Sequence, residues 1–172
     1  MDRKIFGMVV LLLLATGWAN FEPAAAPAPT EVKGIPAIVQ SFAPTQIRPG
    51  DVWKVYLKAS NPEGKMKYIF ATISQPGVGT YPVSIIRIKE ENAKELSGYI
   101  YLNTAPARSP EFFNRSLTLT INIQREGGPF SPPAVFPLFF QANPTPEAPP
   151  EGVFKEQNLG PIMVILRTGK RS

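Results

Sequence analysis

The sequence predicts an all-β protein: an antiparallel β-sandwich of about seven strands with an extra strand at its C-terminal end. The 172 residues include 20 prolines and 13 glycines, and after residue 19 no long stretch repeats its apolar residues at the helical period. Short runs between residues 34 and 142 alternate apolar and polar side chains, as half-buried strands do. Turn-forming residues separate these runs, which favours a sandwich built from hairpins.

Residues 1–19 match a secretory signal peptide. Arg3 and Lys4 precede an apolar run from Ile5 to Ala15, and Gly17-Trp18-Ala19 places small residues at the cleavage positions. The run is shorter than the roughly 20 residues of a membrane-spanning helix, and an uncleaved membrane anchor is the alternative. We therefore expect a signal helix and an exported protein: periplasmic, cell-surface or secreted. Without cysteine the chain cannot be lipidated at this signal.

The first strand follows a linker rich in alanine and proline, residues 20–33. Such a linker favours the extended polyproline conformation, at about 3.1 Å per residue. It is either a disordered N-terminus or, if the signal is retained, a stalk that holds the domain off a surface. The strand itself spans residues 35–42 and begins through Pro36, which predicts an edge position.

A hairpin over residues 47–75 contains the largest apolar side chains. Pro49-Gly50 forms a turn, a strand of strict alternation follows it, and residues 61–64 form the next turn. The return strand, 66–74, carries apolar side chains on both faces and is predicted to be central. In the first strand Trp53, Val55, Leu57 and Ala59 face one side, and Lys54, Tyr56 and Lys58 face the other.

The remaining strands are predicted by the same alternation. They span residues 83–89, 96–103, 116–124 and 133–141, the last weakened by Pro137 and so near an edge. Tyr99 and Tyr101 face outward. The predicted core consists of Trp53, Val55, Leu57, Phe70, Ile86, Ile88, Ile100, Leu102, Leu119 and Ile121.

The hairpin also carries a resemblance. Residues 49–64, P-G-D-x-W-x-V-x-L-x-A-S-N-P-E-G, resemble the start of the bacterial immunoglobulin-like (Ig-like) domains of exported proteins. The resemblance implies an Ig-like sandwich over residues 34–142 and no particular activity. In the related cadherin-like modules an aspartate-rich form of this turn binds calcium. Here the turn has Asn61 and Glu63 but no aspartate, so we expect no calcium.

Composition argues against catalysis. The chain has no histidine and no cysteine, which removes the commonest general base, the commonest zinc ligand and any thiol nucleophile. The acidic stretch 90–95 is predicted to be a solvated loop, because catalytic carboxylates must converge across a cleft. We expect no enzyme activity, no catalytic residues, no metal and no cofactor. The net charge of +5 is scattered and no nucleic-acid motif is present, so no nucleic-acid partner is expected.

The C-terminal region is the least ordinary part of the chain. Residues 143–158 form a Pro-rich connection, and residues 159–172 form an apolar strand with a basic tail. One alternative is that this strand pairs with an edge of its own domain, for instance residues 35–42. The other is donation to a neighbouring subunit, for which the candidate partner-binding residues are Leu159, Ile162, Val164 and Leu166.

Two hypotheses of function follow. The first is a non-catalytic binding or structural module of the cell envelope, which binds an envelope protein or itself through its sheet edges or C-terminal strand. The alternative is a module that binds carbohydrate or an anionic polymer through the outward residues Lys54, Tyr56, Lys58, Tyr99 and Tyr101. Lysines on an outer strand face more often prevent edge aggregation. A membrane partner is expected only if the signal stays uncleaved, and the oligomeric state is open.

Overall fold

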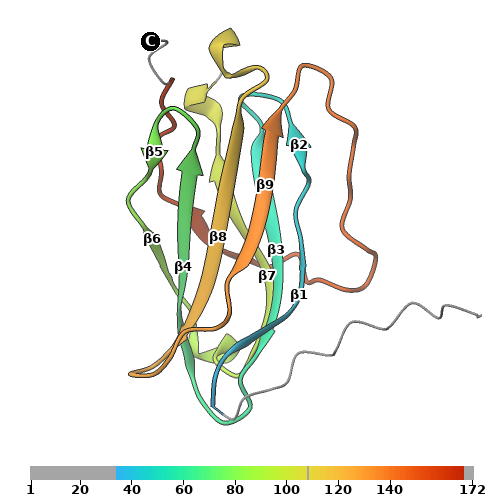
Figure 1. Ribbon diagram of the computed structural model, residues 1–172. Coiled ribbons are helices and arrows are strands. Elements are labelled where there is room, and N and C mark those ends of the chain that lie inside the picture. Colours follow the sequence, from blue (N-terminus) through green and yellow to red (C-terminus); the bar gives the residue numbers. More distant parts are fainter. Residues whose placement is uncertain (1–33, 108, 169–172) are drawn as a thin grey trace, which may run out of the picture.

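The computed structural model describes residues 34–107 and 109–168, which form two packed β-sheets (Figure 1). The expected all-β sandwich is therefore confirmed. The predicted signal peptide (1–19), the linker (20–33) and residues 169–172 of the tail lie outside the described residues. In the part of the chain that is described, no helix has the length and apolar character needed to cross a membrane.

Sheet A has the strand order β1-β3-β7-β10. Its strands are β1 (Ala37–Phe42), β3 (Val52–Ser60), β7 (Glu95–Asn103) and β10 (Asn158–Ile162). β3 pairs antiparallel with both β1 and β7, whereas β10 pairs with β7 in parallel. β1 and β10 are therefore the two edges of this sheet.

Sheet B has the order β2-β9-β8-β4-β5, and β6 also pairs with β4. Its strands are β2 (Gln46–Ile47), β4 (Met66–Gln75), β5 (Gly79–Thr80), β6 (Ser84–Arg87), β8 (Ser116–Arg125) and β9 (Ala134–Phe140). β2 runs parallel to β9, and β4, β8 and β9 pair antiparallel. Short 3-10 turns occur at η1 (Glu90–Asn92), η2 (Ala105–Ala107) and η3 (Pro110–Phe112).

The chain changes sheets between β1 and β2. Trp53, which has no exposed surface, donates a hydrogen bond from its indole nitrogen to the carbonyl oxygen of Pro44 in this crossover, at 2.8 Å. Buried tryptophan needs a partner for its N–H group. The largest core side chain therefore also fixes the point at which the chain passes from sheet A to sheet B.

The core lies between the sheets and follows the predicted alternation with one exception. Nine of the ten predicted core residues are buried in the described structure. Phe70 is not, because Ile69, Ala71 and Ile73 occupy the inward positions of β4 and the ring of Phe70 therefore lies on the outer face of sheet B. A strand with apolar residues on both faces does not reveal by itself which face is inside.

β10 covers the edge of β7 that β3 leaves free. β6 stays in sheet B and η1 leads directly into β7, so no preceding strand occupies that edge. The strand pairs within its own domain, but the suggested pairing with residues 35–42 is wrong, because β1 lies at the opposite edge of sheet A. Figure 1 shows the connection that leads from β9 around to β10 behind β4 and β8.

Candidate functional site

The predicted partner-binding residues of the tail face this domain's own core. Ile162 and Leu166 are 3% and 5% exposed, and Leu159 and Val164 are partly buried against the same core. The outward side chains of this segment are Met163 and Ile165, at 77% and 73% exposure. In this arrangement the four predicted residues complete the sandwich and are not presented to another molecule.

Three buried polar side chains, on β4, on β6 and on the loop between β5 and β6, hold the backbone of the tail. The hydroxyl oxygen of Ser84 accepts a hydrogen bond from the amide of Met163 at 2.8 Å, and that of Tyr81 accepts one from the amide of Arg167 at 2.9 Å. The side-chain amide of Gln75 donates to the carbonyl oxygen of Arg167 at 3.0 Å. All three side chains are under 10% exposed. The Tyr81 hydroxyl also donates to the side-chain oxygen of Gln75, so the tail supplies the remaining partners of a small buried network. Sequence reasoning did not identify them, because nothing in their local pattern signals a distant backbone.

The Pro-rich connection is also fastened to the sandwich. Thr45 donates from its amide and its hydroxyl to the carboxylate of Glu147, at 3.2 and 2.6 Å. Further along, the amide of Lys155 donates to the hydroxyl of Ser97 at 3.1 Å, and the amide of Tyr99 donates to the carbonyl oxygen of Gln157 at 2.8 Å. The segment predicted as a spacer thus lies against the crossover between the sheets at its start and against β7 of sheet A at its end.

This connection covers the predicted aromatic surface. The ring of Tyr56 lies on the outer face of sheet A, as expected, but is only 5% exposed. It packs against Phe42, Tyr99 and Phe154, with ring centroids 6.3, 5.6 and 5.6 Å away. The expectation that Tyr56 is accessible is wrong, because Phe154, almost 100 residues later in the chain, lies over it.

Glu156 joins the same cluster through its carboxylate. It accepts hydrogen bonds from the Lys54 ammonium at 3.0 Å and from the Tyr56 hydroxyl at 2.6 Å. The bond from Tyr56, followed by that from Lys54, lowers the pKa of Glu156. The bond to Glu156 raises the pKa of Lys54, and burial, followed by this carboxylate, raises the pKa of Tyr56.

The five predicted glycan-binding residues do not form one surface. Lys54, Tyr56 and Tyr99 belong to the cluster closed by Phe154 and Glu156, and the tyrosine rings there are inclined by 55° rather than coplanar. Tyr101 lies beside Lys54 on the neighbouring strand and is partly exposed. Lys58 lies further along β3, where it lines a groove.

That groove lies on the outer face of sheet A, between its strands and the turn at residues 152–155. Its volume is about 480 Å³, within the range of small-molecule sites. Lys58 and Lys155 bring two ammonium groups to it, and Glu95 brings one carboxylate. The lining residues are Val39, Lys58, Ala59, Ser60, Glu95, Leu96, Ser97, Gly152, Val153, Phe154 and Lys155.

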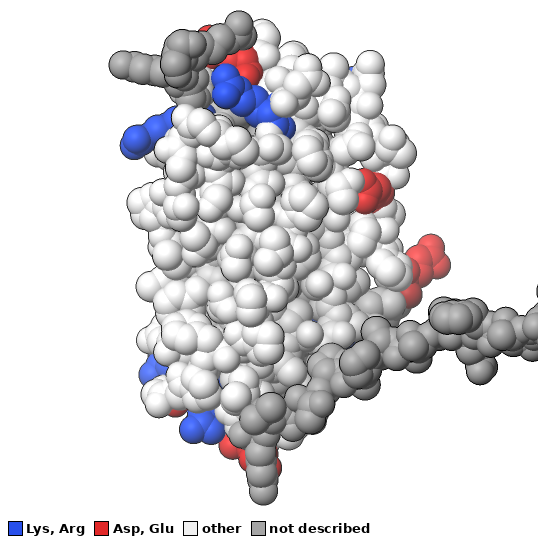
Figure 2. Space-filling view, viewed as in Figure 1, with Lys and Arg blue, Asp and Glu red and all other residues white. Residues whose placement is uncertain are grey.

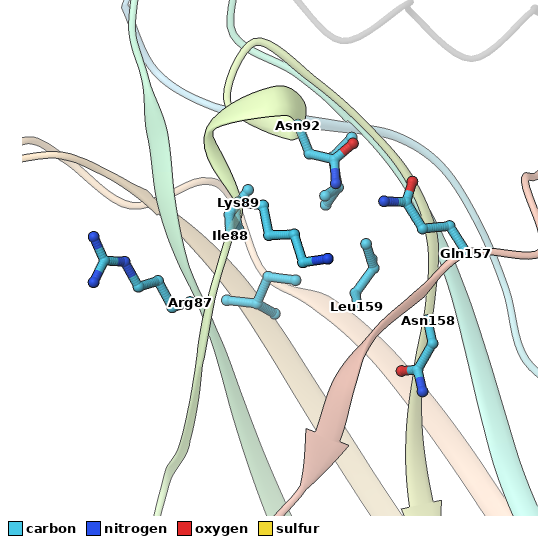
Figure 3. Close-up of a pocket in the computed structure, with 9 residues that line it drawn as sticks. Arg87, Ile88, Lys89, Asn92, Gln157, Asn158 and Leu159 are labelled. Atoms are coloured by element: carbon cyan, nitrogen blue, oxygen red, sulfur yellow. The ribbon is translucent and has the colours of Figure 1, made fainter.

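A second hollow lies where the start of β10 meets the segment after β6 (Figure 3). Polar residues in its lining are Arg87, whose side chain points away from the hollow in Figure 3, and Lys89, Asn92, Gln157 and Asn158. Its free volume is about 10 Å³, which is room for a single water molecule at most. The hollow is therefore a packing gap beside β10 and not a ligand site.

The outer face of sheet B carries exposed apolar side chains and no charge across its centre. Ile85, Phe130, Val135 and Phe139 are 60%, 48%, 57% and 46% exposed. The other outward positions of β4 from Tyr68 to Ser74, of β8 from Ser116 to Gln124 and of β9 are all uncharged: they hold threonine, tyrosine, phenylalanine, serine, asparagine, glutamine and proline. At the rim, β6 carries one outward charge, Arg87, beside Tyr68. Figure 2 shows this side, with the charged residues at its two ends and at its rim. We call it the uncharged face.

Register across the strands explains why the uncharged face was not foreseen. Phe70 lies between Ile85 on β6 and Asn122 on β8. In the next row Thr120 lies between Thr72 on β4 and Val135 on β9. β8 alone alternates like an ordinary surface strand, and β4 and β9 carry apolar side chains on both faces, which does not reveal which of them face outward. The apolar patch becomes apparent only once the four strands are aligned.

Among the described residues, no three of the histidine, cysteine, aspartate or glutamate type lie close enough together to hold a metal ion. The chain was also compared with protein-family models, with curated proteins and with solved structures, and none of these comparisons finds a match.

Proposed function

We propose that this protein is an exported, non-catalytic binding module of the cell envelope, and that it binds a protein partner through the uncharged face. Export is inferred from the predicted signal peptide over residues 1–19. The single observation that supports the binding role is the uncharged face, where side chains such as Ile85 and Val135 are more than half exposed. Exposed apolar patches on soluble domains are typical of interaction sites.

We further propose that the domain is Ig-like. In a constant-type Ig domain, strands A, B, E and D form one sheet and C, F and G form the other. The sheet orders support this: β1, β3 and β7 take the places of A, B and E, and β4, β8 and β9 take those of C, F and G. β10 stands where strand D would be, but runs parallel to its neighbour.

The charge pattern of the face selects the class of partner. A nucleic acid or an anionic polymer is held by lysine and arginine, which are absent from the centre of the face in the described strands. A protein surface that is itself uncharged can dock there without the free-energy cost of burying a charge that has no partner. We therefore infer an uncharged protein surface as the partner.

Site-specific photocrosslinking in the native cells tests this proposal. A photoreactive amino acid placed at Val135 is expected to yield a covalent adduct with a protein. The matched control is Val52 at the start of β3, which is 53% exposed against 57% for Val135 but belongs to sheet A. Adducts from Val52 and none from Val135 would exclude the uncharged face as the binding surface.

The groove on sheet A favours a second candidate function, binding of an anionic glycan. Lys58 and Lys155 supply two positive charges against one from Glu95, and neither lysine takes part in an ion pair between described residues. Two unpaired ammonium groups beside the apolar surface of Phe154 and Val153 suit a sugar chain that carries carboxylates.

Binding of polygalacturonate, measured by calorimetry against neutral dextran, tests the second candidate. Replacing both Lys58 and Lys155 with glutamine is expected to weaken binding at least about tenfold, because two charge-assisted contacts are lost. The matched control replaces Lys65 and Lys94, which are exposed but lie outside the groove, with glutamine and should leave binding unchanged. Equal affinity for dextran and polygalacturonate would remove the groove from consideration.

A further inference from the structure

We propose that the partner of the uncharged face is a second copy of this chain, and that the two copies pack sheet B against sheet B about a two-fold axis. This inference depends on the proposed function, because it names the occupant of the same face. Two-fold dimers bury the same patch on both subunits, so the face must be complementary to itself.

Charge is the first requirement for such self-complementarity. Any lysine or glutamate near a two-fold axis meets its own copy, and like charges placed together cost binding energy. The outer face of sheet A carries Lys54, Lys58 and Glu95 at outward positions, whereas the centre of the uncharged face carries none in the described strands. Of the two broad faces of the sandwich, sheet B is therefore the one on which two copies can meet without repulsion.

The polar groups of the face are the second requirement. Burying an amide or hydroxyl group costs free energy unless it keeps a hydrogen bond. Asn122 and Gln124 already donate from their side-chain amides to the carbonyl oxygens of Ser131 and Gly128, at 3.0 and 3.3 Å. Ser74 and Thr80 share a hydrogen bond between their hydroxyl groups at 3.0 Å. These groups lose little when another sheet covers them.

Shape is the third requirement. The row of Ile85, Phe70 and Asn122 carries larger side chains than the next row, in which Thr72, Thr120 and Val135 are similar to one another in size. Ridges and hollows of this kind allow two sheets to interdigitate at about 10 Å separation, as the two layers of a sandwich do. Four strands about 4.8 Å apart and about 30 Å long give at most on the order of 600 Å² per copy. This is below the roughly 800 Å² per partner of a standard interface, so the dimer is expected to be weak, with dissociation in the micromolar range.

Sedimentation velocity of the purified full chain, over a series from low to high micromolar concentration, tests the inference. The wild-type chain is expected to pass from monomer to dimer. Val135→Glu and Ile85→Glu are each expected to weaken the dimer at least about 100-fold, because each places two like charges in one interface. Val52→Glu is the matched control and is expected to dimerise like the wild type. Circular dichroism checks that each variant is folded.

Spin labels provide a second measurement that does not depend on disruptive variants. The chain has no cysteine, so a single introduced cysteine is labelled without background. In the proposed dimer the two copies of sheet B are about 10 Å apart and the two copies of sheet A about 30 Å apart. Labels on Thr120→Cys are therefore expected to be much closer to each other than labels on Lys58→Cys.

The outcomes separate this inference from the proposed function. A wild-type chain that stays monomeric, a Val52→Glu variant as disruptive as Val135→Glu, or a shorter distance at position 58 than at position 120 overturns the dimer. If the purified chain is monomeric while Val135 crosslinks to a different protein in cells, the proposed function stands and the self-association does not. If the purified chain stays monomeric and a photoreactive amino acid at Val135 gives no adduct in cells, both the dimer and the proposed binding function are wrong.

Discussion

Gly98 is the residue that allows β10 to approach β7. A Cβ atom at this position would lie 2.4 Å from the carbonyl oxygen of Gln157 and 3.0 Å from the side chain of Leu159. Backbone cannot yield as a flexible side chain can, so Gly98→Ala is expected to destabilise the fold by about 1–3 kcal/mol, the usual cost of overpacking. Denaturant unfolding measures the loss. Amide exchange should locate it, because the Tyr99 amide, which donates to Gln157, should exchange faster while amides of sheet B stay protected. Uniformly faster exchange would contradict a local role.

The hydrogen bonds of Glu156 to Lys54 and Tyr56 make the stability of the fold depend on pH. Its pKa in the folded protein is below the ordinary value of 4.5, so its contribution to stability is present above that pH and is lost as the pH falls through the folded pKa. The pKa values of Lys54 and Tyr56 are raised, so their contributions are lost as the pH rises through values above 10.5 and 10.0 respectively.

The variant Glu156→Gln isolates the acid side of this pH dependence. At neutral pH it is expected to unfold at lower denaturant concentration than the wild type, and the difference should shrink as the pH falls below 4.5. Denaturant titrations at several pH values measure it. Glu151→Gln, on the same connection but outside this cluster, should not reproduce the trend. A difference that stays constant with pH would mean that the carboxylate charge plays no part.

At the scale of elements, β10 and the residues after it are an integral part of the sandwich. Deletion of residues 159–172 is expected to destabilise the fold severely, and not to leave it intact as donation to a neighbour would require. Burial of Ile162 and Leu166 alone is worth about 3–6 kcal/mol, against a total stability of about 5–15 kcal/mol for a typical domain. Gln75, Tyr81 and Ser84 would each also lose one hydrogen bond to the backbone of the tail, although Tyr81 and Gln75 would keep the bond between them. Thermal unfolding followed by circular dichroism measures the effect.

A peptide of residues 159–168 extends this test to a strand supplied by another molecule. If the truncated chain regains its structure when the peptide is added, the edge of β7 accepts a strand in trans as well as in cis. Gly98→Ala in the truncated chain is the control, since it should prevent rescue by the same peptide. A truncated chain that is as stable as the full one would show that the tail is dispensable.

Predictability from sequence also differed between elements. β3 and β8 were predicted nearly to their ends, because strict alternation identifies both the strand and its buried face. The cover over Tyr56 and the edge chosen by β10 were not, because each depends on a segment about 60 to 100 residues away. The hydrogen bonds from Gln75, Tyr81 and Ser84 to the backbone of the tail were missed for the same reason. Local pattern carries no information about which distant backbone will lie beside a strand.

At the scale of the whole molecule, the two broad faces differ in kind. The outer face of sheet A combines lysines, glutamates and the covered aromatic cluster, with a groove beside them. The outer face of sheet B is apolar and polar across its centre, and its charged residues lie at the ends and the rim (Figure 2). This division was not visible in the scatter of charges along the chain, because alternation shows which side chains share a face of one strand but not which strands share a sheet.

This division predicts opposite responses to salt. Association through the uncharged face depends on apolar burial, so added sodium chloride should change the dimer dissociation constant little, and sulfate should strengthen the dimer because it is excluded from protein surfaces. Binding of an anionic glycan in the groove should instead weaken as sodium chloride screens Lys58 and Lys155. Sedimentation and calorimetry of the same preparation across a salt series measure both. In the Val135→Glu variant, sulfate should no longer promote a dimer, but sodium chloride should still weaken glycan binding. If moderate sodium chloride dissociates the wild-type dimer, charged residues at the rim, and not the uncharged face, hold the two copies together.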